Sequence, residues 1–161
     1  MTIENIKQLM DDFDIAALLP DIVDIVNRIV QFARIALFAV PLILLGFGMY
    51  YFLVAPKEAN YTAGYRCFWG MGSEEAWRFT QKLAGVLWIL AGLTMTLGVV
   101  LLCGRFAAME FNDVLWTVIF CLLFQGAIVL ILRLLVYVIV MFRFDRKGNR
   151  RYTWIQLWRG Y

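Results

Sequence analysis

Three long stretches of the chain are apolar and free of charged residues, at 35–56, 83–104 and 114–132. The third continues past Arg133 as far as Phe142. A bilayer core about 30 Å thick is crossed by roughly 20 helical residues, because each residue advances the helix by about 1.5 Å. Backbone groups in lipid must be hydrogen-bonded within the segment itself, which favours helices. The pattern therefore predicts an all-α membrane protein with three transmembrane helices.

The first 34 residues have a different pattern, in which apolar and polar positions alternate at helical spacing. The apolar positions are Ile3, Ile6, Met10 and Phe13 and, after Pro20, Ile22, Ile25, Val26, Ile29 and Ala33. The polar positions opposite the second run are Asp21, Asp24, Arg28 and Gln31. We expect two amphipathic helices with a break at Pro20, because proline lacks a backbone donor. They either lie in the membrane interface or pack on the exterior of the bundle.

Small residues and one proline mark the interior of the spans. Pro41 removes a backbone donor from the first span and predicts a kink there. In the second span Gly85, Ala91, Gly92 and Gly98 supply small residues, and Ala84, Ala91 and Gly98 recur every seven positions along nearly one face. Such a face lets a neighbouring helix backbone approach closely. Gln125 in the third span is a candidate for a hydrogen bond between helices.

The last 19 residues are basic and aromatic, with Arg150 and Arg151 followed by Tyr152, Trp154 and Trp158. Cations mixed with aromatic rings suit the headgroup layer of a membrane. The chain is thus expected to comprise an amphipathic N-terminal segment (1–34), a three-helix transmembrane domain (35–142) that includes a loop at 57–82, and an interfacial tail (143–161).

Composition supports the membrane assignment and excludes several kinds of chemistry. Hydrophobic residues make up 63% of the 161 residues, against roughly 45–50% in soluble domains. The chain has no histidine, so the most common metal ligand and general base are both absent. Its three cysteines lack the spacing of a zinc site or a disulfide framework. No catalytic residue, metal or cofactor is therefore expected.

The distribution of positive charge predicts the orientation. Ten lysines and arginines flank the spans on the side of the 57–82 loop and the tail, and four lie on the opposite side. Positively charged flanks stay in the cytoplasm, so we expect the loop and the C-terminus inside and the N-terminus outside, in the cell membrane. Arg133 follows an apolar run of about 28 Å, which places it near the cytoplasmic interface, where it can snorkel. This asymmetry concerns the membrane rather than nucleic acid.

The loop between the first two spans carries the most informative motif. Its candidate site residues are Asn60, Gly64, Arg66, Ser73, Trp77 and Gln81, followed by Gly85 at the start of the next span. Ser73 can cap a helix whose first turn holds Glu74 and Glu75, since acidic side chains suit the positive end of a helix. We expect Arg66 and Trp77 to face the same loop interior, with Arg66 hydrogen-bonded to loop carbonyls or to Asn60.

This motif resembles that of the SdpI family of small bacterial membrane proteins, mainly over 60–92. The family pattern of asparagine, G-x-R, serine, tryptophan and glycine is matched in order and spacing. Cys67 stands where the family more often has threonine, and Gln81 where it often has asparagine or histidine. The resemblance implies a non-enzymatic immunity protein against a membrane-active peptide, in which the motif residues bind a toxin or a regulator.

Two alternatives remain open from the residues alone. Asn60 and Arg66 can serve only to tie down the loop, with aromatic side chains anchoring it at the interface. The whole chain can instead be an accessory or scaffold subunit of a larger membrane complex such as a transporter, or an oligomer. A lipid-modifying enzyme is the weakest alternative, because Cys67 lacks a histidine partner.

Overall fold

The computed structural model describes residues 15–59 and 62–151, with side chains from Val23 onward. In chain order the elements are α2 (Ile15–Met49), the π-helix η1 (Tyr50–Val54), the 3-10 helix η2 (Trp69–Met71), α3 (Glu74–Arg105), the 3-10 helix η3 (Phe106–Ala108) and α4 (Phe111–Arg143). Three helices are long and apolar enough to cross a membrane, with the candidate spans at Val23–Val54, Glu74–Ala108 and Phe111–Arg143. The predicted all-α fold with three transmembrane helices is confirmed.

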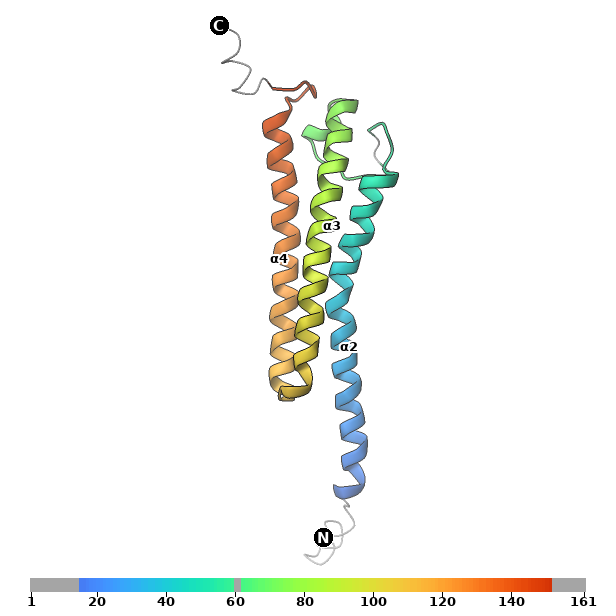
Figure 1. The fold of residues 1–161 in the computed structure, drawn as a ribbon, viewed down its shortest axis with the longest axis vertical. Coiled ribbons are helices and arrows are strands. Elements are labelled where there is room, and N and C mark those ends of the chain that lie inside the picture. Colours follow the sequence, from blue (N-terminus) through green and yellow to red (C-terminus); the bar gives the residue numbers. More distant parts are fainter. Residues whose placement is uncertain (1–14, 60–61, 152–161) are drawn as a thin grey trace, which may run out of the picture.

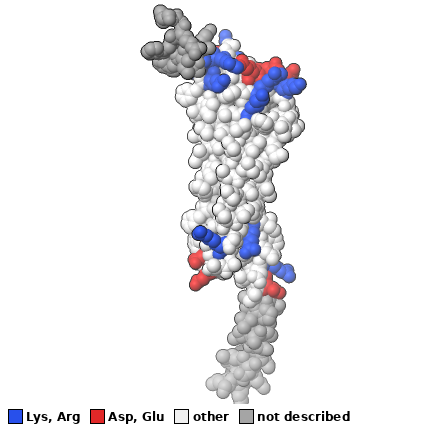
Figure 2. Space-filling model, in the orientation of Figure 1, with Lys and Arg blue, Asp and Glu red and all other residues white. Residues whose placement is uncertain are grey.

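The three helices lie side by side, with α3 between α2 and α4 (Figure 1). The segment that joins α2 to α3 lies at the same end of the bundle as the end of α4, and η3 lies at the other end (Figure 1). Charged side chains gather at the two ends and leave an apolar band between them (Figure 2). Large apolar side chains in that band are exposed, among them Leu97, Phe120 and Leu123 at 61%, 64% and 66%. This surface faces lipid, so the chain is a multi-pass membrane protein.

The N-terminal part of the bundle differs from the prediction. The break expected at Pro20 is wrong, because α2 runs without interruption from Ile15 to Met49. Pro20 stands close to the start of the helix, where its missing donor costs one backbone hydrogen bond and does not stop propagation. The amphipathic run at 21–34 is therefore continuous with the first span instead of forming a separate helix. The predicted amphipathic residues before Ile15 lie outside the described residues.

Glycines bring the backbones of α2 and α3 into direct contact. A Cβ atom on Gly85 would lie 2.9 Å from the backbone nitrogen of Phe52, and one on Gly92 would lie 3.0 Å from that of Leu45. From the other side, a Cβ on Gly48 would lie 3.1 Å from the carbonyl oxygen of Gly85. Only residues without side chains permit such an approach, so these three glycines form the packing seam between the two helices.

The seam lies one residue away from the predicted face. Ala84 is buried, but Gly98 is exposed, and a Cβ on it would meet nothing within 4 Å. The prediction that Ala84, Ala91 and Gly98 form the close-packed face is therefore wrong at its C-terminal end. Gly85 and Gly92 keep the same seven-residue spacing but are rotated by about 100° around α3, because one residue turns an α-helix by that angle.

A hydrogen bond joins the third span to the first, as expected. Gln125 is 2% exposed, and its Nε2 donates to the carbonyl oxygen of Leu37 over 3.1 Å. Around it, at the end of the bundle near η3, the buried residues Leu37, Val99, Phe106, Val114 and Val118 form one hydrophobic cluster. A second cluster lies at the opposite end, beneath the loop.

Replacing Gly92 with leucine is expected to disrupt assembly far more than replacing Leu93 with alanine. The leucine side chain would collide with Leu45, at a cost of at least about 2 kcal/mol, whereas Leu93 is 54% exposed to lipid. The free energy of unfolding in detergent and the yield of membrane-inserted protein measure the difference. Equal stability of Gly92→Leu and Leu93→Ala would show that the seam does not contribute to stability.

Candidate functional site

The start of α3 has the predicted cap. Ser73 is the N-cap residue, with an extended backbone, and its Oγ accepts a hydrogen bond from the Ala76 amide over 3.1 Å. Glu74 and Glu75 stand in the first turn. Their negative charges are favourable beside the unpaired backbone amides at the positive end of the helix. The first turn of α3 is therefore a stable base for the loop that precedes it.

Gln81 holds the loop by pairing with the backbone of Tyr65. The Tyr65 amide donates to Oε1 of Gln81 over 2.7 Å, and Nε2 of Gln81 donates to the Tyr65 carbonyl over 2.8 Å. Gln81 is only 4% exposed and Tyr65 only 6%. A side-chain amide has one donor group and one acceptor group in a plane, so it satisfies both polar groups of a buried residue at once.

Trp77 and Gly64 complete this clamp. Trp77 is fully buried, and its Nε1 donates to the carbonyl of Pro56 over 2.7 Å, which ties the start of the loop to α3. Gly64 has a φ of +100°, and a Cβ there would lie 2.6 Å from the Trp77 ring. A side chain at this position would be strained by the positive φ and would collide with the Trp77 ring, so glycine is required. We call Gly64, Tyr65, Trp77 and Gln81 the loop clamp.

The first part of the C-terminal tail folds back onto the same end of α3. Ser73 Oγ donates to the carbonyl of Gly148 over 2.7 Å, and Arg150 forms an ion pair with Glu75. The turn that presents Gly148 is organised by Asp145, whose Oδ1 accepts from the amide of Asn149 over 2.8 Å. Hydrogen bonds from Asn149 and Lys147 lower the pKa of Asp145. The described tail, up to 151, is therefore part of the loop assembly.

Tyr152, Trp154 and Trp158, the aromatic residues predicted for the headgroup layer, lie outside the described residues. Trp69 in η2 instead provides an aromatic ring for the tail's cations. The guanidinium carbon of Arg151 is 5.4 Å from the centre of that ring, and that of Arg146 is 6.0 Å away. Stacking of this kind adds to the hydrogen bonds that hold the turn against the loop.

Arg66 and Trp77 differ in exposure. Trp77 is buried, whereas the side chain of Arg66 is exposed. The expected hydrogen bonds of Arg66 to loop carbonyls or to Asn60 stay a prediction. The clamp turns the neighbouring Tyr65 and Cys67 inward, and in an extended segment the residue between two inward side chains points outward. Asn60, the proposed partner of Arg66, lies outside the described residues.

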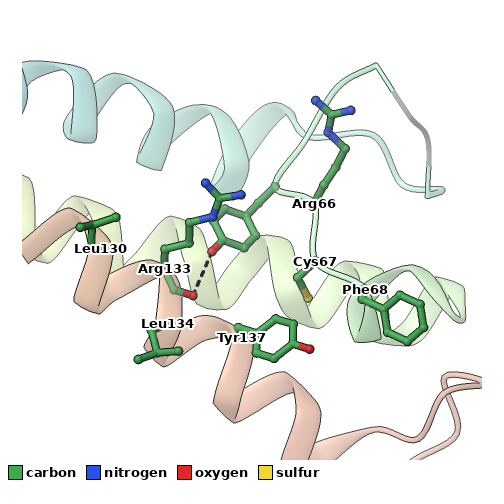
Figure 3. A pocket seen from close by; sticks show the side chains of 8 residues that line it. Arg66, Cys67, Phe68, Leu130, Arg133, Leu134 and Tyr137 are labelled. Atoms are coloured by element: carbon green, nitrogen blue, oxygen red, sulfur yellow. Dashed lines mark hydrogen bonds between the residues drawn. The ribbon is translucent and has the colours of Figure 1, made fainter.

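Arg66 lines a pocket between the loop and α4, with a volume of about 410 Å³. The lining residues are Tyr65, Arg66, Cys67, Phe68, Leu130, Arg133, Leu134 and Tyr137. We call it the loop pocket (Figure 3). The Tyr65 hydroxyl donates to the carbonyl of Arg133 over 3.3 Å, and the Tyr137 hydroxyl accepts from Trp69 Nε1 over 3.1 Å. These two bonds join the loop to α4.

The loop pocket combines predicted and unpredicted residues. Arg66 belongs to the motif. Arg133 was expected only to snorkel at the interface, and Tyr65 and Tyr137 were missed. Tyr137 stands four residues after Arg133, so the two share a helix face, and this spacing is the signal that could have found it. No sequence spacing identifies Tyr65, because its place in the pocket depends on its hydrogen bonds with Gln81. Burial raises the pKa of Tyr65 to about 12, so its hydroxyl stays protonated.

Cys67 is a packing residue in this structure. It is 9% exposed, its Sγ accepts from the Gly70 amide over 3.2 Å, and burial raises the pKa of its thiol. A raised pKa keeps the less reactive thiol form at neutral pH. Within the described part of the chain, no group of three or more cysteine, aspartate or glutamate side chains could hold a metal ion.

The fold and the clamp define a small multi-pass helical membrane protein with a partly buried motif between its first two spans. The SdpI/YfhL protein family model matches residues 57–141, which is more than half of the chain, and the chain belongs to this family. The match contains the loop, α3 and nearly all of α4, and hence every residue that lines the loop pocket. No curated protein and no solved structure matches the chain significantly.

Replacing Gln81 with leucine is expected to lower the free energy of unfolding by roughly 3 kcal/mol, because the amide and carbonyl of Tyr65 would remain buried without partners. Thermal unfolding in detergent measures the change. Gln31→Leu, at an exposed position of α2, is the matched control and should change stability by less than about 0.5 kcal/mol. An equal effect of the two substitutions would contradict the clamp.

Proposed function

We propose that the protein is a non-enzymatic immunity or stress-resistance protein that acts by binding a peptide or protein partner with its 57–82 loop. The family assignment supports this role, because the resemblance of the motif implies resistance to a membrane-active peptide. The observation that carries the proposal is the arrangement of the motif itself. Two buried motif residues, Trp77 and Gln81, hold the loop against α3, and the one charged motif residue, Arg66, is exposed beside Tyr65.

The chemistry of the exposed face suits a binding role. Phe68 is 67% exposed and stands two residues from Arg66. An aromatic ring and a guanidinium on a rigid segment are typical of residues that contribute most to the affinity of protein interfaces. Because the clamp fixes the loop beforehand, a partner would not have to order it on binding, which favours affinity. Asn60, Ser73 and Gln81, the remaining polar motif residues, are assigned by the proposal to the support of this surface.

A second candidate function is that of an accessory subunit in a larger membrane complex. A groove of about 390 Å³ runs between α3 and α4 and is lined by Thr94, Gly98, Phe124 and Gln125, among others. The Oε1 atom of Gln125 is buried and accepts no hydrogen bond. A transmembrane helix of a partner that donates to this atom would satisfy it. This observation favours the second candidate.

The proposal includes an orientation in which the loop and the C-terminus are cytoplasmic. It is supported by the ten-to-four distribution of lysine and arginine. Cys67 is a poor reporter because it is buried, so two exposed glutamates at opposite ends of the bundle are better positions. In a background without the native cysteines, a membrane-impermeant maleimide should label Glu110→Cys in intact cells and Glu58→Cys only after permeabilisation. The reverse labelling would invert the orientation.

Arg66→Ala is expected to abolish protection while the protein still inserts, because the apolar spans determine insertion. Arg66→Lys should restore little protection, since lysine keeps the charge but loses the planar fork of donors. The assay challenges cells that lack the protein with a synthetic form of the secreted peptide encoded beside its gene, and compares survival after complementation with each variant. Arg105→Ala, which removes an exposed arginine from the opposite end of the bundle, should protect fully.

Full protection by Arg66→Ala at normal expression would contradict the binding role of the loop. A gene neighbourhood that encodes transporter subunits and no secreted peptide would favour the accessory-subunit function instead. In that case a copurifying membrane complex, dissociated by substitution of Gln125 with leucine and unaffected by Arg66→Ala, is the expected result.

A further inference from the structure

A second, smaller cavity adjoins the loop pocket on the side of α2. Its volume is about 210 Å³, and its lining residues are Tyr51, Gly64, Tyr65, Arg66, Trp88 and Arg133. We call it the arginine cavity. It shares Tyr65, Arg66 and Arg133 with the loop pocket, so the two spaces meet around the two arginines. Figure 3 shows Arg66 coming from the loop and Arg133 from α4.

The arginine cavity is rich in hydrogen-bond donors and in positive charge. Two guanidinium groups line it, and none of the described residues in its lining or in that of the loop pocket is a carboxylate. The Nε1 atom of Trp88 is buried and has no acceptor. Buried donors are nearly always paired in native structures, so an unpaired indole N–H beside two arginines indicates a missing acceptor. An oxyanion supplies both the acceptor atoms and the negative charge.

Position along the membrane identifies the source of the anion. Arg133 follows the apolar run at 114–132, which is about 28 Å long as a helix, and so lies where the hydrocarbon core meets the headgroups. Next to it, Leu130 and Leu134 line the loop pocket and are 69% and 62% exposed to the lipid side. A ligand that enters here meets apolar surface first and the arginines second.

We propose that the arginine cavity binds the phosphate group of an anionic membrane phospholipid, with the lipid's apolar part along Leu130 and Leu134. Arg66 and Arg133 contact the phosphate from two sides, and Trp88 donates its indole N–H to a phosphate oxygen. A free phosphate ion offers the same acceptor oxygens but gains nothing from the leucines, so the site selects the lipid. This inference goes beyond the proposed function and does not depend on it.

The test measures binding of an acyl-labelled fluorescent phosphatidylglycerol to the full-length protein in detergent micelles by anisotropy. Unlabelled phosphatidylglycerol should displace it at least about tenfold more effectively than phosphatidylcholine, because the choline ammonium cancels the negative charge that the two arginines attract. Arg133→Gln and Arg66→Gln should each weaken binding by about tenfold. Lys82→Gln removes an exposed cation of α3 that lines neither space, and should change affinity less than about twofold.

Trp88→Phe keeps an aromatic ring and removes only the indole donor, so it tests the site even if an arginine variant folds poorly. It should weaken phosphatidylglycerol binding about tenfold, as expected for one hydrogen bond to a charged phosphate. Equal displacement by the two lipids, or equal effects of Arg133→Gln and Lys82→Gln, would overturn the proposal. Release of the labelled lipid by millimolar inorganic phosphate would overturn the lipid as ligand and assign the cavity to a soluble phosphate. Protection by Arg133→Gln is measured in a separate assay. A variant that loses lipid binding but still protects cells leaves the proposed function intact.

Discussion

The pairing of the Gln81 side chain with the backbone of Tyr65 determines the geometry of everything around the loop. Both polar groups of Tyr65 are buried, where an unpaired amide or carbonyl is costly, and Gln81 satisfies both from one position on α3. Because this fixes Tyr65, its ring reaches α4 and bonds to the carbonyl of Arg133. The two following residues then alternate, with Arg66 outward and Cys67 inward. The exposure of Arg66 therefore follows from the buried pairing of Gln81 with Tyr65.

The clamp depends in turn on how closely α2 approaches α3. Gly85 lies one helical turn after Gln81 and touches the backbone of Phe52, in the π-helix that ends the first span. That contact brings the end of α2 against α3, so that the carbonyl of Pro56 meets the indole of Trp77. The glycine seam in the membrane and the clamp above it are therefore one continuous contact between the same two helices, and a change in the seam would displace the loop.

The two proposed binding surfaces lie at the same end of the bundle and share Arg66. Arg66 and Phe68 form an exposed face suited to a protein or peptide, and Arg66 and Arg133 enclose a donor-rich cavity suited to a phosphate. The tail turn packs against the start of α3 through Ser73 and Glu75. A rigid loop at a membrane surface can in this way meet a partner from the aqueous side and a lipid from the bilayer side. Both proposals need the same clamp, because it orients Arg66.

The sequence by itself determined the features that depend on local composition. Three apolar runs of sufficient length predict three spans, because only long apolar helices cross the hydrocarbon core. A serine followed by two glutamates predicts the start of α3, because these residues satisfy the unpaired amides of a helix N-terminus. Only the tertiary structure decided which face of α3 packs and which way Arg66 points. A shift from Ala84 to Gly85 turns the contact face by about 100°, and the contact with α2 selects it. The direction of Arg66 follows from a bond between Tyr65 and a residue 16 positions away, which no local pattern encodes.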